Sequence, residues 1–314
     1  MSFGRTPIFK DCKMTIKIKD LSDEEMLFHG SPGCPGCGAY LGLKLALKIL
    51  GPKTMVINST GCITACTMFG NTKVPFFHPL FNNIAAVASG IDTGLDVEGK
   101  RDGVNILAFS GDGGTADIGL QALSGAVERG HNFIYICYDN ESYMNTGGQR
   151  SGTTPFAAST STTPAGKKSI GETRPFTQRK DMVEIIRAHK APYVASASIA
   201  YPLDYMEKVK KAASINGPTF IHLHATCPTG WGVDPKYTIE VARQAVKCGM
   251  IVLREITNGA ERVTIAPKKL ADVTEYLKYQ RRFRHIMGND EVINKFRTYI
   301  NELRARHGLN PNVA

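Results

Sequence analysis

The sequence lacks any long hydrophobic run. Among its 314 residues, no apolar stretch approaches the roughly 20 residues that a membrane-spanning helix needs. The N-terminal segment carries scattered charges in place of the apolar core of a secretory signal peptide. We therefore expect a soluble protein of the cytoplasm, with no membrane among its partners.

Two cofactor-binding patterns are also absent. No Gly-x-Gly-x-x-Gly follows the first expected strand, which excludes the dinucleotide fingerprint of Rossmann-type dehydrogenases. No run of the type Cys-x2-Cys-x2-Cys-x3-Cys occurs, so we expect no ferredoxin-type pair of iron–sulfur clusters on this chain.

A basic stripe is missing as well. Lys and Arg outnumber Asp and Glu by 38 to 28, which gives a net charge of +10. These basic residues are spread along the chain and are not interleaved with aromatic residues, as they would be in a nucleic-acid-binding surface. We expect no nucleic-acid partner, and we interpret the charge as a surface for acidic proteins.

What the sequence does contain is a regular alternation of helical and strand-like segments from residue 37 to about 225. This alternation predicts an α/β protein with a doubly wound, mostly parallel sheet. The expected strands are 54–58, 104–110, 133–139, 193–198 and 219–225, and the expected helices include 37–50, 82–95, 181–189 and 203–215.

Beyond residue 240 the alternation is expected to stop. Two amphipathic helices are expected, over 268–285 and 290–305. We therefore predict an α/β domain over residues 1–240 and a helical extension over residues 241–314. The extension packs either on partner subunits or on its own domain.

A glycine-rich turn follows the second expected strand. In Ser110-Gly111-Asp112-Gly113-Gly114, the glycines let the backbone approach a ligand, and the N–H groups at a following helix start favour phosphate. Asp112 supplies a carboxylate for a cation bridging that phosphate, and Asn140 ends the next strand at the same sheet edge. A simple tight turn explains the glycines equally well.

Four of the eight cysteines are expected to converge. Cys34 and Cys37 form a Cys-x-x-Cys before the first helix, while Cys62 and Cys227 each follow a strand end. Such a set suits structural zinc, a redox dithiol or an iron–sulfur cluster. The remaining cysteines are interpreted as packing or surface thiols, namely Cys12, Cys66, Cys137 and Cys248.

The spacing of Asp112 and Asn140 resembles the signature of thiamine-diphosphate enzymes. The continuation Tyr143-Met144-Asn145-Thr146-Gly147-Gly148-Gln149 resembles a loop of the 2-oxoacid:ferredoxin oxidoreductases. This resemblance implies the pyrophosphate-binding type of thiamine fold and one Mg²⁺ held by Asp112, Asn140 and the main-chain carbonyl of Ser142. It also implies a thiamine diphosphate site that includes a catalytic Asn145. The implied cofactor-binding residues are Gly111, Asp112, Gly113, Gly114, Asn140, Asn145, Thr146 and Cys62.

The cysteines resemble the same family over roughly residues 30–235. Thr60-Gly61-Cys62 and Cys227-Pro228-Thr229-Gly230-Trp231 are similar to its cluster-binding segments. The resemblance implies a [4Fe–4S] cluster on Cys34, Cys37, Cys62 and Cys227. Trp231 is expected either to shield that cluster or to pack in the core, and His222 and His224 are expected to be structural histidines with their hydrogen bonds satisfied.

The resemblance further implies a β subunit that catalyses thiamine-dependent oxidative decarboxylation together with other chains. No residue here matches the glutamate that thiamine enzymes place against the aminopyrimidine ring. An α subunit is therefore expected to supply that glutamate on its pyrimidine-binding domain. Further γ or δ subunits with a ferredoxin-type two-cluster domain, and an external ferredoxin, are expected to accept the electrons.

The substrate is expected to be a small 2-oxoacid. Family members that use pyruvate tend to carry a Glu shortly after the Thr-Gly-Cys cysteine, whereas this chain reads Cys62-Ile63-Thr64-Ala65-Cys66. The chain resembles most the β subunit of oxalate oxidoreductase, which implies oxalate oxidation to CO₂ without coenzyme A. Pyruvate or another 2-oxoacid with coenzyme A is the alternative. A non-redox thiamine decarboxylase and a zinc-stabilised, non-catalytic assembly subunit are alternatives of other classes.

Overall fold

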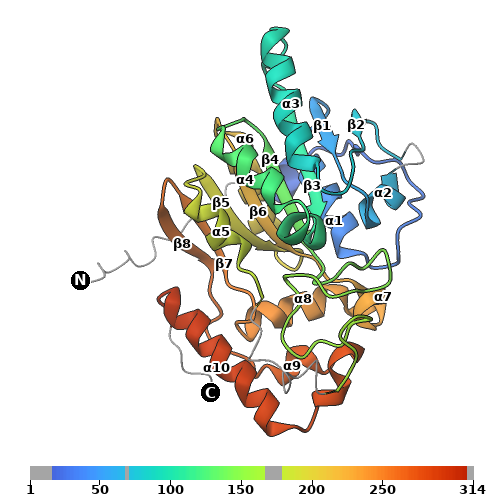
Figure 1. Ribbon diagram of the computed structural model, residues 1–314, viewed down its shortest axis with the longest axis vertical. Coiled ribbons are helices and arrows are strands. Elements are labelled where there is room, and N and C mark those ends of the chain that lie inside the picture. The colour runs from blue at the N-terminus through green and yellow to red at the C-terminus, as the bar shows by residue number, and fades with distance from the viewer. Residues whose placement is uncertain (1–15, 68–70, 167–178, 310–314) are drawn as a thin grey trace.

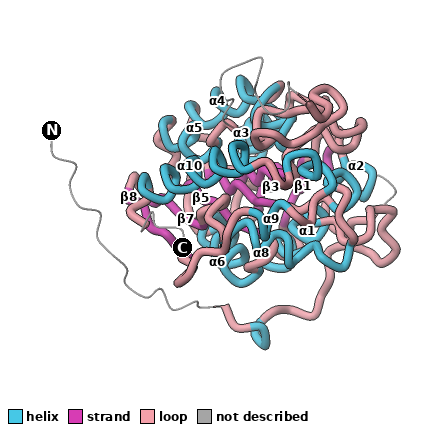
Figure 2. The backbone as a smooth tube through the Cα atoms, turned by 90° about the horizontal axis from the view of Figure 1, so that it is seen from below, coloured by secondary structure: helices cyan, strands magenta, loops and turns pink. Residues whose placement is uncertain are grey.

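A computed structural model describes residues 16–67, 71–166 and 179–309. In these ranges one sheet lies between two layers of helices (Figures 1 and 2). Its strands are β1 (Thr54–Ile57), β2 (Phe76–Phe77), β3 (Asn105–Gly111), β4 (Ile134–Asp139), β5 (Tyr193–Ser198), β6 (Thr219–His224), β7 (Leu253–Thr257) and β8 (Ala260–Ile265).

The sheet has the order β2-β1-β3-β4-β6-β5-β7-β8. All pairings from β2 across to β5 are parallel, and β7 and β8 complete the sheet in antiparallel pairings. The prediction of a doubly wound, mostly parallel sheet is confirmed.

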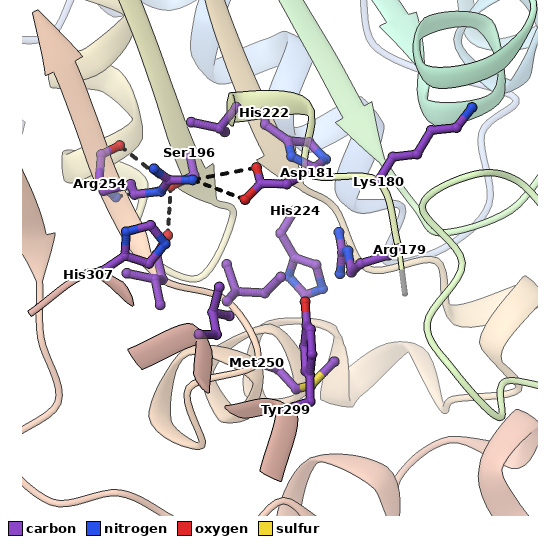
Figure 3. Close-up of a pocket in the computed structure, with 14 residues that line it drawn as sticks. Arg179, Lys180, Asp181, Ser196, His222, His224, Met250, Arg254, Tyr299 and His307 are labelled. Atoms are coloured by element: carbon purple, nitrogen blue, oxygen red, sulfur yellow. Dashed lines mark hydrogen bonds and ion pairs between the residues drawn. The ribbon is translucent and has the colours of Figure 1, made fainter. Parts of the chain in front are cut away.

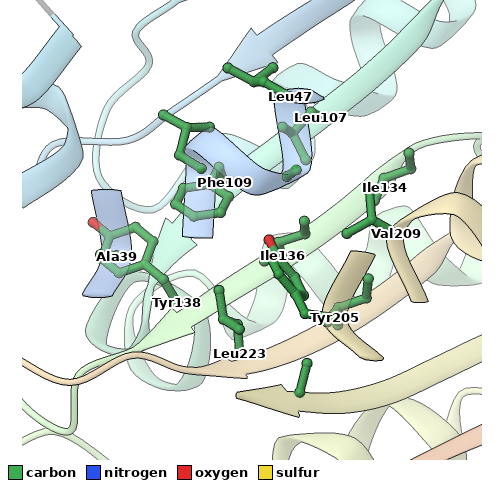
Figure 4. Close-up of a cluster of buried hydrophobic side chains, with 14 of the residues drawn as sticks. Ala39, Leu47, Leu107, Phe109, Ile134, Ile136, Tyr138, Tyr205, Val209 and Leu223 are labelled. Atoms are coloured by element: carbon green, nitrogen blue, oxygen red, sulfur yellow. The ribbon is translucent and has the colours of Figure 1, made fainter. Parts of the chain in front are cut away.

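Helices α1 (Gly38–Leu50) and α6 (Pro202–Ala213) cover one face of the sheet. In α1 the apolar side chains recur at helical spacing, so that Leu43 and Leu47 are buried against the sheet. Phe109 and Leu223 face them from the strands (Figure 4). The helix ends at Gly51, whose φ of +72° suits glycine.

Helices α3 (Ile84–Val97), α4 (Leu120–Glu128) and α5 (Met182–Ala188) cover the opposite face (Figure 2). Small residues of α3, such as Ala85 and Ala88, are fully buried there and let this helix lie close to the strands. Two short helices, α2 (Cys62–Thr67) and α7 (Pro228–Trp231), follow β1 and β6 at one edge of the sheet.

The segment beyond residue 240 differs from expectation. Strands β7 and β8 extend the sheet, joined by the tight turn Asn258-Gly259, so the alternation does not stop there. The expected helix over 268–285 is wrong, because this segment forms only α9 (Thr274–Leu277) and a 3₁₀ helix, η4 (Arg281–Ile286). Between them Gln280 is extended, and its side chain bonds the Tyr276 carbonyl and Arg282.

Helix α10 (Asp290–Arg306) confirms the second expected helix. Val292, Phe296 and Ile300 are buried in a third apolar cluster that also contains Phe156 and Trp231. Helix α8 (Thr238–Lys247) contributes to the same cluster. The C-terminal segment thus covers its own chain, while its packing on partner subunits and the division after residue 240 stay predictions.

Within the described ranges, no helix combines the length and the apolar character that crossing a membrane would demand.

Candidate active site

Four strands that are consecutive in the sheet, β1, β3, β4 and β6, end at the same edge. Cys62 follows β1, Asp112 follows β3, Asn140 follows β4, and Cys227 lies just beyond β6. The two oxygen-bearing residues therefore lie on the middle strands, and the two cysteines flank them. The sheet order brings together residues that are up to 165 positions apart in the sequence.

A cavity of about 370 Å³ opens at this edge. This volume lies within the range of small-molecule and cofactor sites. It is lined by Thr60, Gly61, Cys62, Leu80, Phe81, Gly111, Asp112, Gly113, Gly114, Tyr138, Asn140, Ser142, Tyr143, Met144, Asn145 and Thr146. The lining contains every residue expected to hold thiamine diphosphate, and Asn145 and Thr146 are among its exposed members.

The glycines of the turn are required by close packing. A Cβ atom at Gly113 would overlap the ring of Tyr143, and one at Gly114 would lie 2.7 Å from Ser110 Oγ. The expected helix does not begin directly after them. A π-helical turn (Gly113–Asp117) comes first, and α4 begins only at Leu120. Such turns are frequent at functional sites.

Three oxygen-bearing groups meet at the cavity wall. The end of the Asn140 amide lies 2.8 Å from the Ser142 carbonyl oxygen and 3.0 Å from Asp112 Oδ1. With its NH₂ group turned toward these atoms, Asn140 donates two hydrogen bonds. With its oxygen turned toward them, three oxygens converge, and octahedral Mg²⁺ places neighbouring ligand oxygens about 2.9 Å apart. The donor set therefore fits a magnesium ion.

The other oxygen of Asp112 is already occupied. Asp112 Oδ2 accepts hydrogen bonds from Ser151 Oγ and, at 3.1 Å, from Thr153 Oγ1. Burial, followed by the charge of Asp139, raises the pKa of Asp112 well above its ordinary value. A cation at Oδ1 would offset both effects.

Behind these groups lies a buried ion-pair network that the sequence did not predict. Arg179 bonds Asp139 at 2.7 Å and Glu141 at 3.0 Å, and Arg282 from η4 bonds the other oxygen of Glu141. Burial alone would raise the pKa of Asp139, but Arg179 and His222 lower it below its ordinary range.

Glu141 lies between Asn140 and Ser142 and has a φ of +65°, which is costly for a residue with a side chain. Its N–H donates to Asp139 Oδ1 at 2.8 Å, and its carbonyl accepts from Thr154 at 2.7 Å. Together with the two arginines, these bonds hold the strained residue. The network thus fixes the backbone that presents Asn140 and Ser142 to the cavity.

Trp231 joins the cysteine segment to the same backbone. Its indole N–H donates to the Asn140 carbonyl at 2.8 Å, and the side chain is fully buried. The guanidinium of Arg282 lies 4.0 Å from the centre of its ring. The expected packing of Trp231 in the core is confirmed, and its shielding of a cluster stays a prediction. Trp231 also supports the loop that carries Asn140.

The four expected cysteine ligands lie close enough to influence one another. Burial, followed by the neighbouring Cys227, Cys37, Cys66 and Cys34, raises the pKa of Cys62. Burial also raises the pKa of Cys227 to about 12. In the part of the chain that the structure describes, no three His, Cys, Asp or Glu side chains form a group able to hold a metal ion.

Two of these thiols cap helices. Cys37 Sγ accepts the N–H of Tyr40 at 3.5 Å at the start of α1, and Cys227 Sγ accepts the N–H of Gly230 at 3.3 Å at the start of α7. Backbone N–H groups aimed at sulfur stabilise thiolates and cluster sulfurs. The N–H of Gly38 donates to the Thr226 carbonyl at 3.0 Å, which fastens the Cys-x-x-Cys segment beside Cys227.

The remaining cysteines follow expectation where they are described. Cys137 and Cys248 are buried in the core, and Cys66 is buried beside the four expected ligands. Cys12 lies outside the described residues.

A second, smaller pocket of about 70 Å³ contains both strand histidines (Figure 3). His222 is satisfied as expected, because its Nε2 lies 2.8 Å from Asp139. For His224 the expectation is wrong: neither ring nitrogen has a hydrogen-bond partner among the described residues. Burial lowers the pKa of His224 to about 4, so its ring is neutral at physiological pH.

Comparison with known proteins agrees with this geometry. Residues 59–223 match the family model of the C-terminal TPP-binding domain of thiamine pyrophosphate enzymes. A solved 2-oxoglutarate:ferredoxin oxidoreductase from Magnetococcus marinus superposes with a TM-score of 0.55 at 24% identity. That match covers 73% of this chain and 81% of the other, and it shows a shared fold.

Two curated relatives are more similar in sequence. The pyruvate synthase subunit PorB of Methanothermobacter thermautotrophicus is 56% identical over 269 residues, which are 85% of this chain and 92% of that protein. The ketoisovalerate oxidoreductase subunit VorB of Pyrococcus horikoshii is 45% identical over 283 residues, which are 87% and 90% of the two chains. The chain therefore belongs to the thiamine pyrophosphate enzymes and, among them, to the β subunits of the 2-oxoacid:ferredoxin oxidoreductases.

Proposed function

We propose that this β subunit holds thiamine diphosphate through Mg²⁺, carries one [4Fe–4S] cluster, and acts on pyruvate with coenzyme A as part of a larger enzyme. The observation that supports it most is the meeting of Asp112 Oδ1, the Asn140 amide and the Ser142 carbonyl at the cavity wall.

In this proposal the diphosphate lies against the turn Gly111–Gly114, where the absence of side chains leaves room for it. Asp112, Asn140 and Ser142 would hold the Mg²⁺ ion that accompanies the diphosphate. When bound, thiamine supplies an electron sink for cleaving the bond between the carboxylate and the carbonyl carbon of the substrate. The protein's own groups would orient the cofactor, and Asn145 and Thr146, which line the cavity, would contact the reacting carbonyl.

The cluster is proposed on Cys34, Cys37, Cys62 and Cys227. Cys62 supports its position, because this residue lines the thiamine cavity and also neighbours the other three thiols. An oxidative decarboxylation releases electrons that must leave the site, and a cluster bound at the cavity wall gives them a short exit. Structural zinc on the same thiols is the competing assignment, and it predicts no such exit.

The chain needs partners to complete this chemistry. The exposed side chain of Leu80 lies on the cavity wall, and Phe77 and Ile118 are exposed apolar residues on neighbouring segments. Large exposed apolar side chains at a site rim are typical of a protein interface. We propose that an α subunit covers this rim and supplies the glutamate for the aminopyrimidine ring. Electrons then pass through a two-cluster γ or δ subunit to a ferredoxin.

The substrate assignment rests on the relatives. The similar proteins are named for pyruvate and for ketoisovalerate, and the oxalate expectation gains no support from them. The Cys62–Cys66 sequence, from which oxalate was expected, forms a helix with Ile63 and Thr64 buried. The identity of these side chains is therefore explained by local packing and is no argument for oxalate as the substrate.

The test is anaerobic purification of the complete enzyme with its partner subunits. Thiamine, magnesium, iron, sulfide and zinc are measured per β subunit. Viologen reduction is then followed with pyruvate, ketoisovalerate, 2-oxoglutarate and oxalate, each with and without coenzyme A. We expect one thiamine and about twelve irons per β subunit, four from the cluster on this chain and eight from the two clusters of the partner subunit. We expect fastest turnover of pyruvate, dependent on coenzyme A. Stoichiometric zinc with no iron beyond that of the two partner clusters would overturn the cluster, and oxalate turnover without coenzyme A would overturn the substrate.

A further inference from the structure

A fifth cysteine shares the cluster region with the four expected ligands. Helix α2 begins at Cys62 and contains Cys66 one turn later. Residues four apart on a helix lie on the same face, with Cβ atoms about 5–6 Å apart. Cys66 therefore faces the same side of α2 as the ligand Cys62.

Cys66 also contacts the segment that carries Cys34. Its sulfur would lie 2.8 Å from a Cβ atom at Gly33, the residue before Cys34, so only a glycine leaves room for the thiol. Ser31 hydrogen-bonds this thiol, and Cys37 and Cys34 are close enough to affect its charge. Cys66 thus lies between Cys62 on one side and the Cys-x-x-Cys segment on the other.

The exposure of the thiols separates Cys34 from the rest. Cys34 is exposed, and it occupies a turn with Gly36 at a φ of +71°. Cys66 is only 3% exposed and sits on a helix. A cluster with four corners thus has five thiols around it, and the ligand most open to solvent is next to the spare one.

We propose that Cys66 is a reserve ligand that binds the cluster iron in place of Cys34 when Cys34 is lost or released. This proposal rests on the proposed cluster. In the exchange the iron–sulfur bond to Cys34 breaks and one to Cys66 forms. The proton that leaves the Cys66 thiol is taken up by the released Cys34 or, where Cys34 has been lost, by water, so the charge and the oxidation state of the cluster do not change.

The role differs from ordinary packing in one respect. If a buried thiol only fills space, removing it does not change the iron content of the protein. A reserve ligand makes the iron content depend on Cys66 only when Cys34 is absent. The two roles are therefore separated by a pair of substitutions and not by either one alone.

The experiment compares C34A, C34A/C66A and C34A/C248A in the complete, anaerobically prepared enzyme. Cys248 is a matched control, since it is also a buried thiol but belongs to the third apolar cluster. Iron and sulfide per β subunit and the electron paramagnetic resonance of the reduced cluster are measured. We expect about twelve irons per β subunit with a shifted spectrum in C34A and in C34A/C248A, and a fall toward about eight irons, those of the partner clusters, in C34A/C66A.

Loss of the cluster in C34A alone overturns the proposal, and so does equal iron content in all three variants. If C34A/C66A does not assemble, C34A/C66S replaces it. The serine fills the same space, and its oxygen ligand would change the resonance spectrum relative to C34A, whereas an unchanged spectrum overturns the proposal. A wild-type enzyme with no iron beyond that of the two partner clusters would instead contradict the proposed function, so the two failures are distinguishable.

Discussion

Replacing Trp231 by phenylalanine (W231F) isolates a single hydrogen bond between the two halves of the proposed site. The indole N–H donates to the Asn140 carbonyl at 2.8 Å, and both residues are buried. Phenylalanine keeps an aromatic ring against the guanidinium of Arg282 but has no N–H group. The substitution therefore leaves the Asn140 carbonyl without this donor.

Such a loss costs about 1–3 kcal/mol for a buried carbonyl. Asn140 and Ser142 would hold Mg²⁺ in the proposed site, so we expect a backbone displaced by this loss to bind the cofactor more weakly. Because 1.4 kcal/mol corresponds to a factor of ten, we expect the dissociation constant of thiamine diphosphate with Mg²⁺ to rise about tenfold, within a range of about 5- to 150-fold.

Equilibrium dialysis of thiamine diphosphate against the complete enzyme measures this change. The control is Y193F, which removes the 2.9 Å hydrogen bond that the hydroxyl of Tyr193 donates to Glu255. Tyr193 is fully buried, and neither residue lines the cavity. W231F should weaken cofactor binding, while Y193F should lower only the melting temperature. If both variants lose stability and neither loses affinity, Trp231 is a packing residue and the reasoning is refuted.

Three further predictions concern charge and space. D112N should weaken Mg²⁺-dependent thiamine binding at least about 100-fold, as measured by dialysis. The same substitution should raise the melting temperature of the cofactor-free protein, because burial and Asp139 raise the pKa of the carboxylate that it removes. A lower melting temperature would contradict this reasoning. G113A should abolish thiamine binding by displacing Tyr143, whereas G94A, on exposed helix with open space around it, should stabilise by about 0.5–1 kcal/mol. Burial raises the pKa of Glu261, but His307 and Arg254 lower it, to about 2 from 4.5. The contribution of Glu261 to the free energy of unfolding, about 1–2 kcal/mol, is therefore complete above pH 4.5 and disappears as the pH falls toward 2. Between pH 4.5 and 2 the melting temperature of E261Q should depend less on pH than that of the wild type.

The strand ends that build the site were predictable because buried strands and glycine turns are local signals. Asp112 and Asn140 end adjacent parallel strands, so their convergence follows from the sheet order. The hairpin of β7 and β8 was missed although Asn258-Gly259 is a strong two-residue turn signal. Charged residues such as Arg254 and Glu261 interrupt the apolar pattern of these two strands. They are accommodated there because they form an ion pair at 3.3 Å.

The supporting network could not be predicted. Arg282 lies 141 positions beyond Glu141, the carboxylate that it bonds, and nothing in its own segment distinguishes it from its neighbours Arg281 and Arg284. The positive φ of Glu141 is likewise decided by the tertiary structure, since Asp139, Thr154 and two arginines hold it. Sequence patterns identify the groups that touch a ligand more readily than those that hold them.

These supporting contacts join the two proposed cofactor sites into one unit. The segment after Cys227 bonds Asn140 through Trp231, and Met144 packs so closely on Gly230 that a side chain there would collide with it. The N–H of Gly38 fastens the Cys-x-x-Cys segment to Thr226. A displacement at Cys227 is therefore transmitted to the backbone that presents Asn140. In the proposed enzyme these three contacts would set the separation between cluster and cofactor, on which the rate of electron transfer depends.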